Sequence, residues 1–311
     1  MHGRVAQRAS TAVLALAVVG CSGLPTEPIT GAGDFRRSFE LDGETRSYLV
    51  HVPATVDLGR PAPVVLAFHG IPSSAQEMRE LADLEAVAAS EGFIVVYPEV
   101  SRAGDWNHSC RDCSGAAGFG FDDVQFTARV IDKMALDMSI DRRRVYATGF
   151  SQGALLTFRL ACDLSHRIAA VATVGATMLD WQTYNCEPFR PVPIAMIHGS
   201  ADEEFPPGGR RGVLVSSVTV DAMVTHWVTT DGCTGSPSAV DLPDVAADGT
   251  TVVRTTYAAC ASGAEVVYYQ VEGGGHTWPG SSFDFSPLLG VTSQDLEASQ
   301  AIADFLLRFT L

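Results

Sequence analysis

The sequence predicts an α/β fold with a mostly parallel central sheet and helices on both of its faces. Short apolar runs rich in valine, isoleucine and phenylalanine alternate along the chain with longer stretches of helical periodicity. Strands that alternate with helices pair in parallel through right-handed crossovers. With 311 residues, 46% of them hydrophobic, the chain can bury one large core. We therefore expect a single folded domain over residues 35–311.

Residues 1–20 resemble an export signal rather than part of the fold. Two arginines precede a nine-residue apolar stretch, Thr11–Val19, which is too short to span a membrane. The stretch ends in Val18-Val19-Gly20-Cys21, which resembles the lipobox of bacterial lipoproteins, where the cysteine is lipidated after cleavage. An ordinary secretory signal with an incidental cysteine is the alternative. Residues 21–34, rich in Gly, Pro and Thr, are expected to form a flexible tether.

Six further cysteines indicate disulfides, because an even number in an exported chain usually pairs. They are Cys110, Cys113, Cys162, Cys186, Cys233 and Cys260. Sequence does not fix the pairing, and we favour neighbours in order: Cys110–Cys113, Cys162–Cys186 and Cys233–Cys260. A zinc site at Cys110 and Cys113 is the alternative, but no second cysteine or histidine pair has suitable spacing. We expect no metal.

The first part of the domain is expected to begin with a hairpin. Strands over 36–40 and 46–52 flank Asp42-Gly43, a typical hairpin turn. The apolar run 63–68 predicts a strand buried on both faces. A helix should then begin at Ser74, cap with Glu77 and stop near Gly92, and a further buried strand should cover 93–97. The inner stripe of that helix comprises Leu81, Leu84, Val87 and Ala88.

Residues 99–120 form a long irregular segment, which in a compact domain is typical of one wall of a binding cleft. Asp122 and Asp123 then suit the positive end of a helix dipole. The inward positions of this helix are Val124, Ala128, Ile131, Met134 and Met138. The remaining expected elements are strands over 144–148, 168–174, 193–197, 252–257 and 265–271, and helices over 152–161, 218–228 and 292–309. In the last helix, Ile302, Phe305, Leu306 and Phe309 share one face.

The sequence Gly149-Phe150-Ser151-Gln152-Gly153 lies between a predicted strand and a predicted helix, the setting of a nucleophile elbow. Two other polar residues, Asp202 and His276, each follow another predicted strand. Because ligands bind beyond the carboxyl ends of parallel strands, we expect these three side chains to converge. Their order, Ser then Asp then His, is one of the orders used by catalytic triads.

Each member has a chemical role in acyl transfer. Ser151 would attack an ester carbonyl, and His276 would take its proton and return it to the leaving alcohol. Asp202 would hold the imidazole in the correct tautomer. The backbone amides of Gln152 and Ile71 would stabilise the oxyanion. No cofactor is required.

Each of these residues also has a structural alternative. Asp202 could cap a turn, with Glu203 or Glu204 serving instead. His276 could be structural, although three preceding glycines suggest an exposed, shaped loop. We expect His69 and His198, which end buried strands, to be architectural.

Two tryptophans are candidate substrate-binding residues. Trp278 and, more weakly, Trp106 could offer a flat wall to an acyl or sugar group. Packing in the core is the alternative for both.

The net charge of the chain limits the classes of partner that it can bind. The formal net charge is −15, from 36 acidic and 21 basic residues. A nucleic-acid-binding protein needs clustered positive charge, and no such cluster is visible in the sequence. We therefore expect no nucleic-acid partner and no polyanionic substrate.

A set of motifs occurs in the order typical of one family. They are Phe68-His69-Gly70, Tyr97-Pro98, Asp122-Asp123-Val124, Ile140-Asp141-Arg142-Arg143-Arg144-Val145-Tyr146, Gly149-Phe150-Ser151-Gln152-Gly153, His198-Gly199-Ser200-Ala201-Asp202 and Gly275-His276-Thr277-Trp278-Pro279-Gly280. Together they resemble the polyhydroxybutyrate-depolymerase and feruloyl-esterase branch of the α/β-hydrolases, including lipoprotein members. The resemblance covers roughly residues 35–309. It implies an α/β-hydrolase fold and a carboxylic ester hydrolase with Ser151, Asp202 and His276 as triad, without metal or cofactor.

Three features depart from the family pattern. Ile71 stands where several members have cysteine or a small polar residue, and Ala154 where many have glycine. The loop around Cys110 is longer than expected. We also see no polymer-binding module, so soluble or oligomeric esters are favoured over solid polyester.

The leading hypothesis is therefore an extracytoplasmic bacterial serine esterase, lipid-anchored or secreted, acting on hydroxyalkanoate oligomers or on hydroxycinnamoyl or acetyl esters of carbohydrates. A serine peptidase on the same triad is an alternative, although such peptidases commonly add a cap or propeller domain. A non-catalytic surface-binding lipoprotein is another, but the complete triad argues against it. We expect a monomer whose only membrane contact is the N-terminal lipid anchor.

Overall fold

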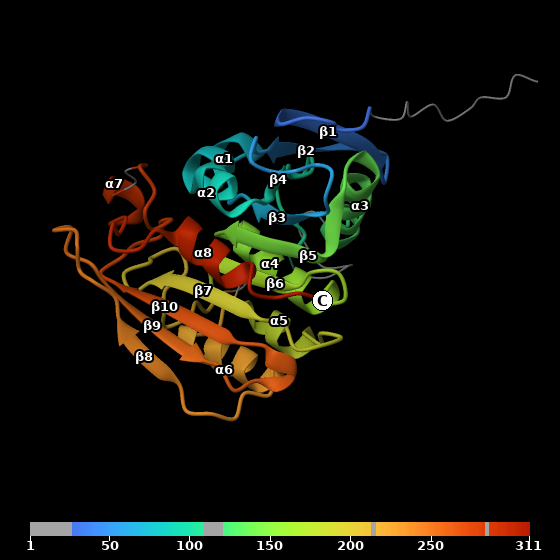
Figure 1. Ribbon diagram of the computed structural model, residues 1–311. Helices are drawn as coiled ribbons and strands as arrows, with labels where there is room; N and C mark the ends of the chain where they lie inside the picture. The colour runs from blue at the N-terminus through green and yellow to red at the C-terminus, as the bar shows by residue number, and fades with distance from the viewer. Residues whose placement is uncertain (1–26, 109–120, 213–215, 284–285) are drawn as a thin grey trace, which may run out of the picture.

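A ten-stranded sheet runs through the molecule (Figure 1). The structure is a computed structural model, which describes residues 27–108, 121–212, 216–283 and 286–311. The strands are β1 (Gly33–Leu41), β2 (Glu44–Val52), β3 (Ala62–Phe68), β4 (Ile94–Pro98), β5 (Ile140–Phe150), β6 (Ala170–Val174), β7 (Ile194–Gly199), β8 (Ser238–Asp241), β9 (Thr251–Tyr257) and β10 (Val266–Glu272). The helices are α1 (Ala75–Ala82), α2 (Leu84–Glu91), α3 (Asp123–Asp137), α4 (Gln152–Asp163), α5 (Asp180–Asn185), α6 (Val220–Thr230), α7 (Ser286–Leu289) and α8 (Ala298–Leu306), with a 3-10 turn, η2, at Ala261–Gly263.

The strand order is β1-β2-β4-β3-β5-β6-β7-β10-β9-β8. The six central strands, β4 to β10 in this order, are parallel, and antiparallel strands flank them at both edges. Helices α3, α4 and α6 pack on one face, and α1, α2 and α8 pack on the other (Figure 1). The predicted fold class, including helices on both faces, is confirmed.

Strand β3 illustrates why the central strands are continuously apolar. All seven of its residues are buried. Val64, Leu66 and Phe68 contribute to the core on one face, and Val65 and Ala67 contribute to the core on the other. Because successive side chains of a strand point to opposite faces, a strand covered on both sides must be apolar throughout.

The predicted hairpin is also present. Strands β1 and β2 pair from Gly33 opposite Val52 to Leu41 opposite Glu44. The connecting residues Asp42 and Gly43 both have positive φ, 52° and 76°. A two-residue hairpin turn of this kind needs positive φ at both positions, and Asp-Gly meets that need at low cost.

The helix expected from Ser74 to Gly92 divides into two. Ser74 caps α1 by accepting a hydrogen bond from the Glu77 amide at 3.2 Å, as predicted. Asp83 then adopts a left-handed conformation with φ of 43°, which ends α1 and starts α2 in a new direction. Aspartate tolerates this conformation better than most residues, so the periodic apolar pattern alone does not reveal the break.

Two other helices differ from the prediction. In α3 the buried face includes Phe126 and Val130, whereas Val124 and Ala128 are only half-buried. The closing helix spans Ala298–Leu306 rather than residues 292–309. The segment before it is held instead by Asp295, which accepts hydrogen bonds from two backbone amides of the loop after β8, at 2.7 and 2.8 Å.

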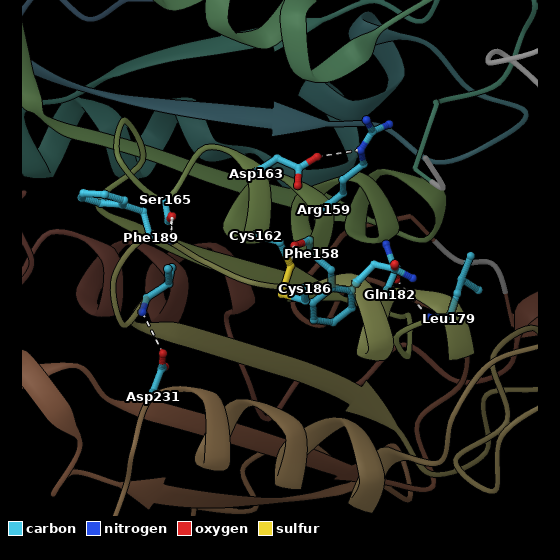
Figure 2. Close-up of a disulfide and its surroundings, with 12 residues drawn as sticks. Phe158, Arg159, Cys162, Asp163, Ser165, Leu179, Gln182, Cys186, Phe189 and Asp231 are labelled. Carbon is cyan, nitrogen blue, oxygen red and sulfur yellow. Dashed lines mark hydrogen bonds and ion pairs between the residues drawn. A yellow bond between two sulfur atoms is a disulfide. The ribbon is translucent and has the colours of Figure 1, made fainter. Parts of the chain in front are cut away.

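Two of the three predicted disulfides are confirmed, Cys162–Cys186 and Cys233–Cys260. Figure 2 shows the first of them, which links the end of α4 to the residue after α5. Cys21, Cys110 and Cys113 lie outside the described residues, as do the predicted signal segment 1–20 and residues 21–26 of the predicted tether. In the described part of the chain, no helix is both long and apolar enough to cross a membrane.

Candidate active site

Ser151 occupies a strained turn between β5 and α4. Its φ and ψ are 56° and −120°, a conformation that is unfavourable for a residue with a side chain. Glycine is required beside it, because a Cβ at Gly153 would lie 2.2 Å from the Phe68 carbonyl oxygen. The Ser151 amide donates to the carbonyl of Val174 on β6 at 3.0 Å. The turn therefore has the strand, strained serine and helix of the predicted nucleophile elbow.

Asp202 and His276 meet at the ends of two neighbouring strands. Asp202 follows β7 and His276 follows β10, and these strands pair in parallel. The distance between His276 Nδ1 and Asp202 Oδ2 is 2.8 Å. The other carboxylate oxygen of Asp202 accepts a hydrogen bond from the Phe205 amide at 2.7 Å. With Nδ1 donating to the carboxylate, Nε2 of the neutral ring is left as the proton acceptor.

Burial distinguishes Asp202 from its predicted rivals. Asp202 is 2% exposed and His276 is 4% exposed, whereas Glu203 and Glu204 lie on the surface. A carboxylate held by two hydrogen bonds in a buried position can orient an imidazole, and an exposed one holds it poorly. The geometry thus favours Asp202 as the partner of His276.

The ring of His276 packs against two aromatic rings. The centroid of Phe150 lies 4.9 Å from that of His276, and the centroid of Phe205 lies 5.9 Å from it. The backbone amide of His276 donates to the Leu289 carbonyl at 2.6 Å. Contrary to the prediction, the glycine-rich loop before it is not exposed. A Cβ at Gly275 would lie 2.0 Å from that same carbonyl, so glycine permits a close packed approach.

The two other histidines at strand ends, His69 and His198, are buried and bond to backbone carbonyls close to the site residues. His198 donates from Nε2 to the Phe205 carbonyl at 2.8 Å, next to the turn that carries Asp202. Burial lowers the pKa of His198, so its ring is neutral at pH 7. His69 Nδ1 donates to the Gly70 carbonyl at 2.7 Å. Both positions match the architectural role that the sequence suggested.

Ser151 and His276 line one cavity of about 550 Å³. Its walls combine small, apolar and acidic side chains. They are Gly70, Ile71, Pro72, Ser73, Glu77, Glu80, Leu81, Phe150, Ser151, Glu204, His276, Phe283 and Leu289. The segments that carry the two predicted oxyanion donors both reach this cavity, because Ile71 lines it directly and Gln152 follows Ser151 as the first residue of α4. The first amides of a helix have no acceptor within the helix, so the Gln152 amide is available to a ligand.

Neither tryptophan lines the cavity. Trp106 is 1% exposed, donates from Nε1 to the His69 carbonyl at 2.9 Å and donates from its backbone to Gln152 Oε1 at 3.0 Å. It thereby braces both predicted oxyanion segments from within the protein. Trp278 is also 1% exposed, and its Nε1 donates to Ser299 Oγ at 3.0 Å. These are the positions that the core-packing alternative predicts.

Several cavity residues were not expected from the sequence. Glu80, Phe283 and Leu289 carried no motif, and Glu77 was noted only as a helix cap. Their position depends on how α1, Phe283 and α7 pack against the sheet edge, which no local pattern encodes. We therefore see no signal in a single sequence that would have identified them.

One cluster in the described part of the chain has the geometry of a metal site, but it lies at another edge of the sheet. It comprises Asp34, His51 and Glu85. Arg79 already donates to Asp34 at 2.7 Å and to Glu85 at 3.0 Å. A guanidinium between the carboxylates supplies the positive charge that an ion would bring, so the cluster is satisfied as an ion-pair network.

Comparison with known proteins points to esterases. The family model described as "Esterase PHB depolymerase" matches residues 46–181. "Putative esterase NocK" of Nocardia uniformis subsp. tsuyamanensis is 31% identical over 312 residues, which cover 96% of this chain and 90% of that protein. Feruloyl esterase B of Piromyces equi is 26% identical over 74% of this chain, which spans only 42% of that relative.

Solved structures show the same fold at low identity. Acetyl xylan esterase from Aspergillus awamori superposes with a TM-score of 0.55 at 14% identity, covering 78% of this chain and 94% of that one. A ferulic acid esterase from Anaeromyces mucronatus has a TM-score of 0.55 at 14% identity, covering 91% and 93% of the two chains.

Proposed function

Because this chain belongs to the PHB-depolymerase family of esterases and is a carboxylic ester hydrolase, we propose that it is a serine esterase with Ser151, His276 and Asp202 as its catalytic triad. One observation carries the proposal. The hydrogen bond of 2.8 Å between His276 and Asp202 lies beside a cavity that the strained Ser151 also lines. A nucleophile, a base and the group that orients the base are the parts that acyl transfer requires.

The reaction proceeds in two halves. Ser151 Oγ attacks the ester carbonyl carbon while His276 Nε2 takes the hydroxyl proton, and the C=O π electrons move onto oxygen. The tetrahedral intermediate collapses, the carbon–oxygen bond to the leaving alkoxide breaks, and His276 returns the proton to give the alcohol. Water, deprotonated by His276, then attacks the acyl-enzyme. Collapse releases the carboxylic acid and regenerates the Ser151 hydroxyl, so ester and water yield acid and alcohol.

The surrounding residues stabilise charge at each step. The backbone amides of Gln152 and Ile71 face the developing oxyanion, and loss of one such donor typically costs about 3–4 kcal/mol of transition-state stabilisation. Asp202 keeps the His276 ring in the Nδ1–H tautomer and stabilises the imidazolium that forms. Phe150 and Phe205 restrict rotation of the ring.

The substrates we propose are hydroxyalkanoate oligomers or hydroxycinnamoyl and acetyl esters of carbohydrates. The cavity of about 550 Å³ carries apolar side chains, among them Ile71, Leu81 and Phe283, that suit a small acyl group. The relatives named as feruloyl esterase and acetylxylan esterase support this range.

We further propose that the enzyme works outside the cytoplasm, held by a lipid on Cys21. Two disulfides support an oxidising compartment. In a bacterial host, the wild type should incorporate radiolabelled palmitate and sediment with membranes, and Cys21→Ala should do neither. Equal labelling of both would refute the anchor.

Labelling and kinetics together test the triad. A fluorophosphonate should label the wild type at Ser151, and the protein should hydrolyse p-nitrophenyl esters of short acids and methyl ferulate. Ser151→Ala should lose both properties. Asp202→Asn should lower kcat by about 10³–10⁴, because the imidazole then favours the wrong tautomer. The matched control is Glu203→Gln, an exposed neighbour that should stay within about twofold of the wild type.

Other outcomes would contradict the proposal in distinct ways. Folded protein that is not labelled and does not turn over esters would indicate a non-catalytic scaffold. Turnover of amides alone would indicate a peptidase. Full activity in Asp202→Asn would show that this carboxylate does not orient His276.

A further inference from the structure

The walls of the active-site cavity carry three negative charges. Glu77 and Glu80 reach it from α1, and Glu204 reaches it from the loop after β7. All three side chains belong to exposed residues at the mouth. Among the described residues, none of those that line the cavity is a lysine or an arginine.

The hydrogen-bond partners of Glu77 and Glu80 are neutral groups. Glu77 accepts a hydrogen bond from the Ser74 hydroxyl at 3.2 Å. Glu80 accepts one from the Gln76 side-chain amide at 2.7 Å. Within the described ranges, none of the three forms an ion pair. A hydrogen bond from a neutral group leaves the net charge of the carboxylate unchanged.

The nearby cationic side chains are engaged elsewhere. Arg79 lies on α1 between Glu77 and Glu80, but its guanidinium pairs with Asp34 of β1 and Glu85 of α2. Arg210 donates to the carbonyl of Glu203 at 3.0 Å and does not line the cavity. Within the part of the chain that the structure describes, the cavity mouth is therefore a region of uncompensated negative charge.

A cleft lined by one sign of charge, with apolar walls, concentrates its field on whatever enters. Ile71, Leu81 and Leu289 supply such walls here. Clefts of this type change the association rate of charged ligands by about 10- to 10³-fold at low salt. The same field raises the free energy of an anion held near Ser151 and lowers that of a cation.

We propose that Glu77, Glu80 and Glu204 set the substrate class of this esterase: esters whose acyl group is uncharged or positively charged are accepted, and esters whose acyl group carries a carboxylate are rejected. The inference rests on the proposed serine-esterase function, because it concerns the charge of the acyl group presented to Ser151. The acid that hydrolysis releases is an anion at neutral pH, so the same three residues favour its departure.

Three p-nitrophenyl esters of matched length test the proposal. Their acyl chains end in a methyl group, a trimethylammonium group or a carboxylate: pentanoate, 4-(trimethylammonio)butanoate and hemiglutarate. Each kcat/KM is divided by the alkaline hydrolysis rate of the same ester, which removes differences in intrinsic reactivity. The wild type should prefer the cationic over the anionic ester by about tenfold or more at low salt. At about 1 M salt, where the Debye length is roughly 3 Å, the preference should approach unity.

Charge variants assign the effect to the cavity. In Glu77→Gln/Glu80→Gln/Glu204→Gln, the cationic-to-anionic ratio should fall about tenfold, and because it is a ratio on one protein, any general loss of activity cancels. The matched control is Glu91→Gln/Asp241→Asn/Asp244→Asn, which removes three exposed charges away from the cavity. The control should keep the wild-type ratio.

The result that would overturn the proposal is equal turnover of the cationic and anionic esters by the wild type, or an unchanged ratio in the cavity variant. A ratio that falls equally in the control would assign the preference to the overall charge of −15 and would also overturn it. Each of these results can occur while pentanoate is hydrolysed normally and Ser151 is labelled. Failure of the serine-esterase proposal is distinct, because then the neutral ester is not hydrolysed and Ser151 is not labelled.

Discussion

Replacing Gly175 with alanine should impair catalysis far more than stability. Gly175 follows β6 and has a φ of 64°. A Cβ built there would lie 3.0 Å from Cε2 of Phe150 and 3.3 Å from Nδ1 of His276, both closer than ordinary van der Waals contact. The Nδ1 atom is the one that bonds Asp202 at 2.8 Å. The added methyl group therefore presses on the atom that fixes the orientation of the imidazole.

The expected size of each effect follows from these contacts. A left-handed φ costs an alanine about 1–2 kcal/mol relative to glycine, and relief of the close contacts moves the His276 ring. Because misplacement of a reacting group by about 1 Å can cost 10²-fold in rate, we expect kcat to fall by roughly 10- to 100-fold. The free energy of unfolding should fall by about 1–3 kcal/mol, from backbone strain and crowding together.

Gly43→Ala is the matched control for this experiment. Gly43 has a φ of 76°, and a Cβ there has no atom within 4 Å. It should lose a similar amount of stability through backbone strain and none of the activity. Urea unfolding gives the free energies, and p-nitrophenyl acetate gives kcat below the unfolding transition. If Gly175→Ala keeps kcat within threefold of Gly43→Ala, the idea that crowding at Nδ1 controls the base is wrong.

Three further predictions concern stability. Asp123→Ala should lower the free energy of unfolding by about 3–5 kcal/mol, because it leaves the guanidinium of Arg46, 2.6 Å away and equally buried, without its partner; a loss below about 1 kcal/mol in urea unfolding would contradict this. Burial raises the pKa of Asp231 (Figure 2) to about 7, so the folded state retains a proton that the unfolded chain releases above about pH 4, and stability falls as pH rises from 4 to 7. Asp231→Asn should be more stable relative to wild type at pH 8 than at pH 5, by about 2 kcal/mol in urea unfolding at each pH; a difference independent of pH would refute the assignment. Cys162→Ser/Cys186→Ser should lose about 3 kcal/mol for a loop with a sequence separation of 24, and thermal unfolding in both reduced and oxidised buffer should show the loss only in the oxidised one.

Local sequence was sufficient to predict the framework of the fold and the strand ends at which Ser151, Asp202 and His276 lie. Strand β3 is apolar throughout because it is covered on both faces, so its burial could be predicted from seven residues alone. The elbow at Ser151 needs glycine at fixed neighbouring positions, and this requirement appears directly as a motif. Because parallel strands end at one edge, chain order alone predicted that Asp202 and His276 would approach each other.

Only the tertiary structure decided which of the candidate side chains are buried and which residues line the cavity. The burial of Trp106 and Trp278 depends on partners such as His69 and Ser299, which are distant in sequence. The acidic mouth brings together residues of α1 and Glu204, more than a hundred positions apart. A local pattern records what a segment needs from its own neighbours, whereas the side chains that share a cavity are determined by how whole elements pack, and this packing is a property of the complete chain.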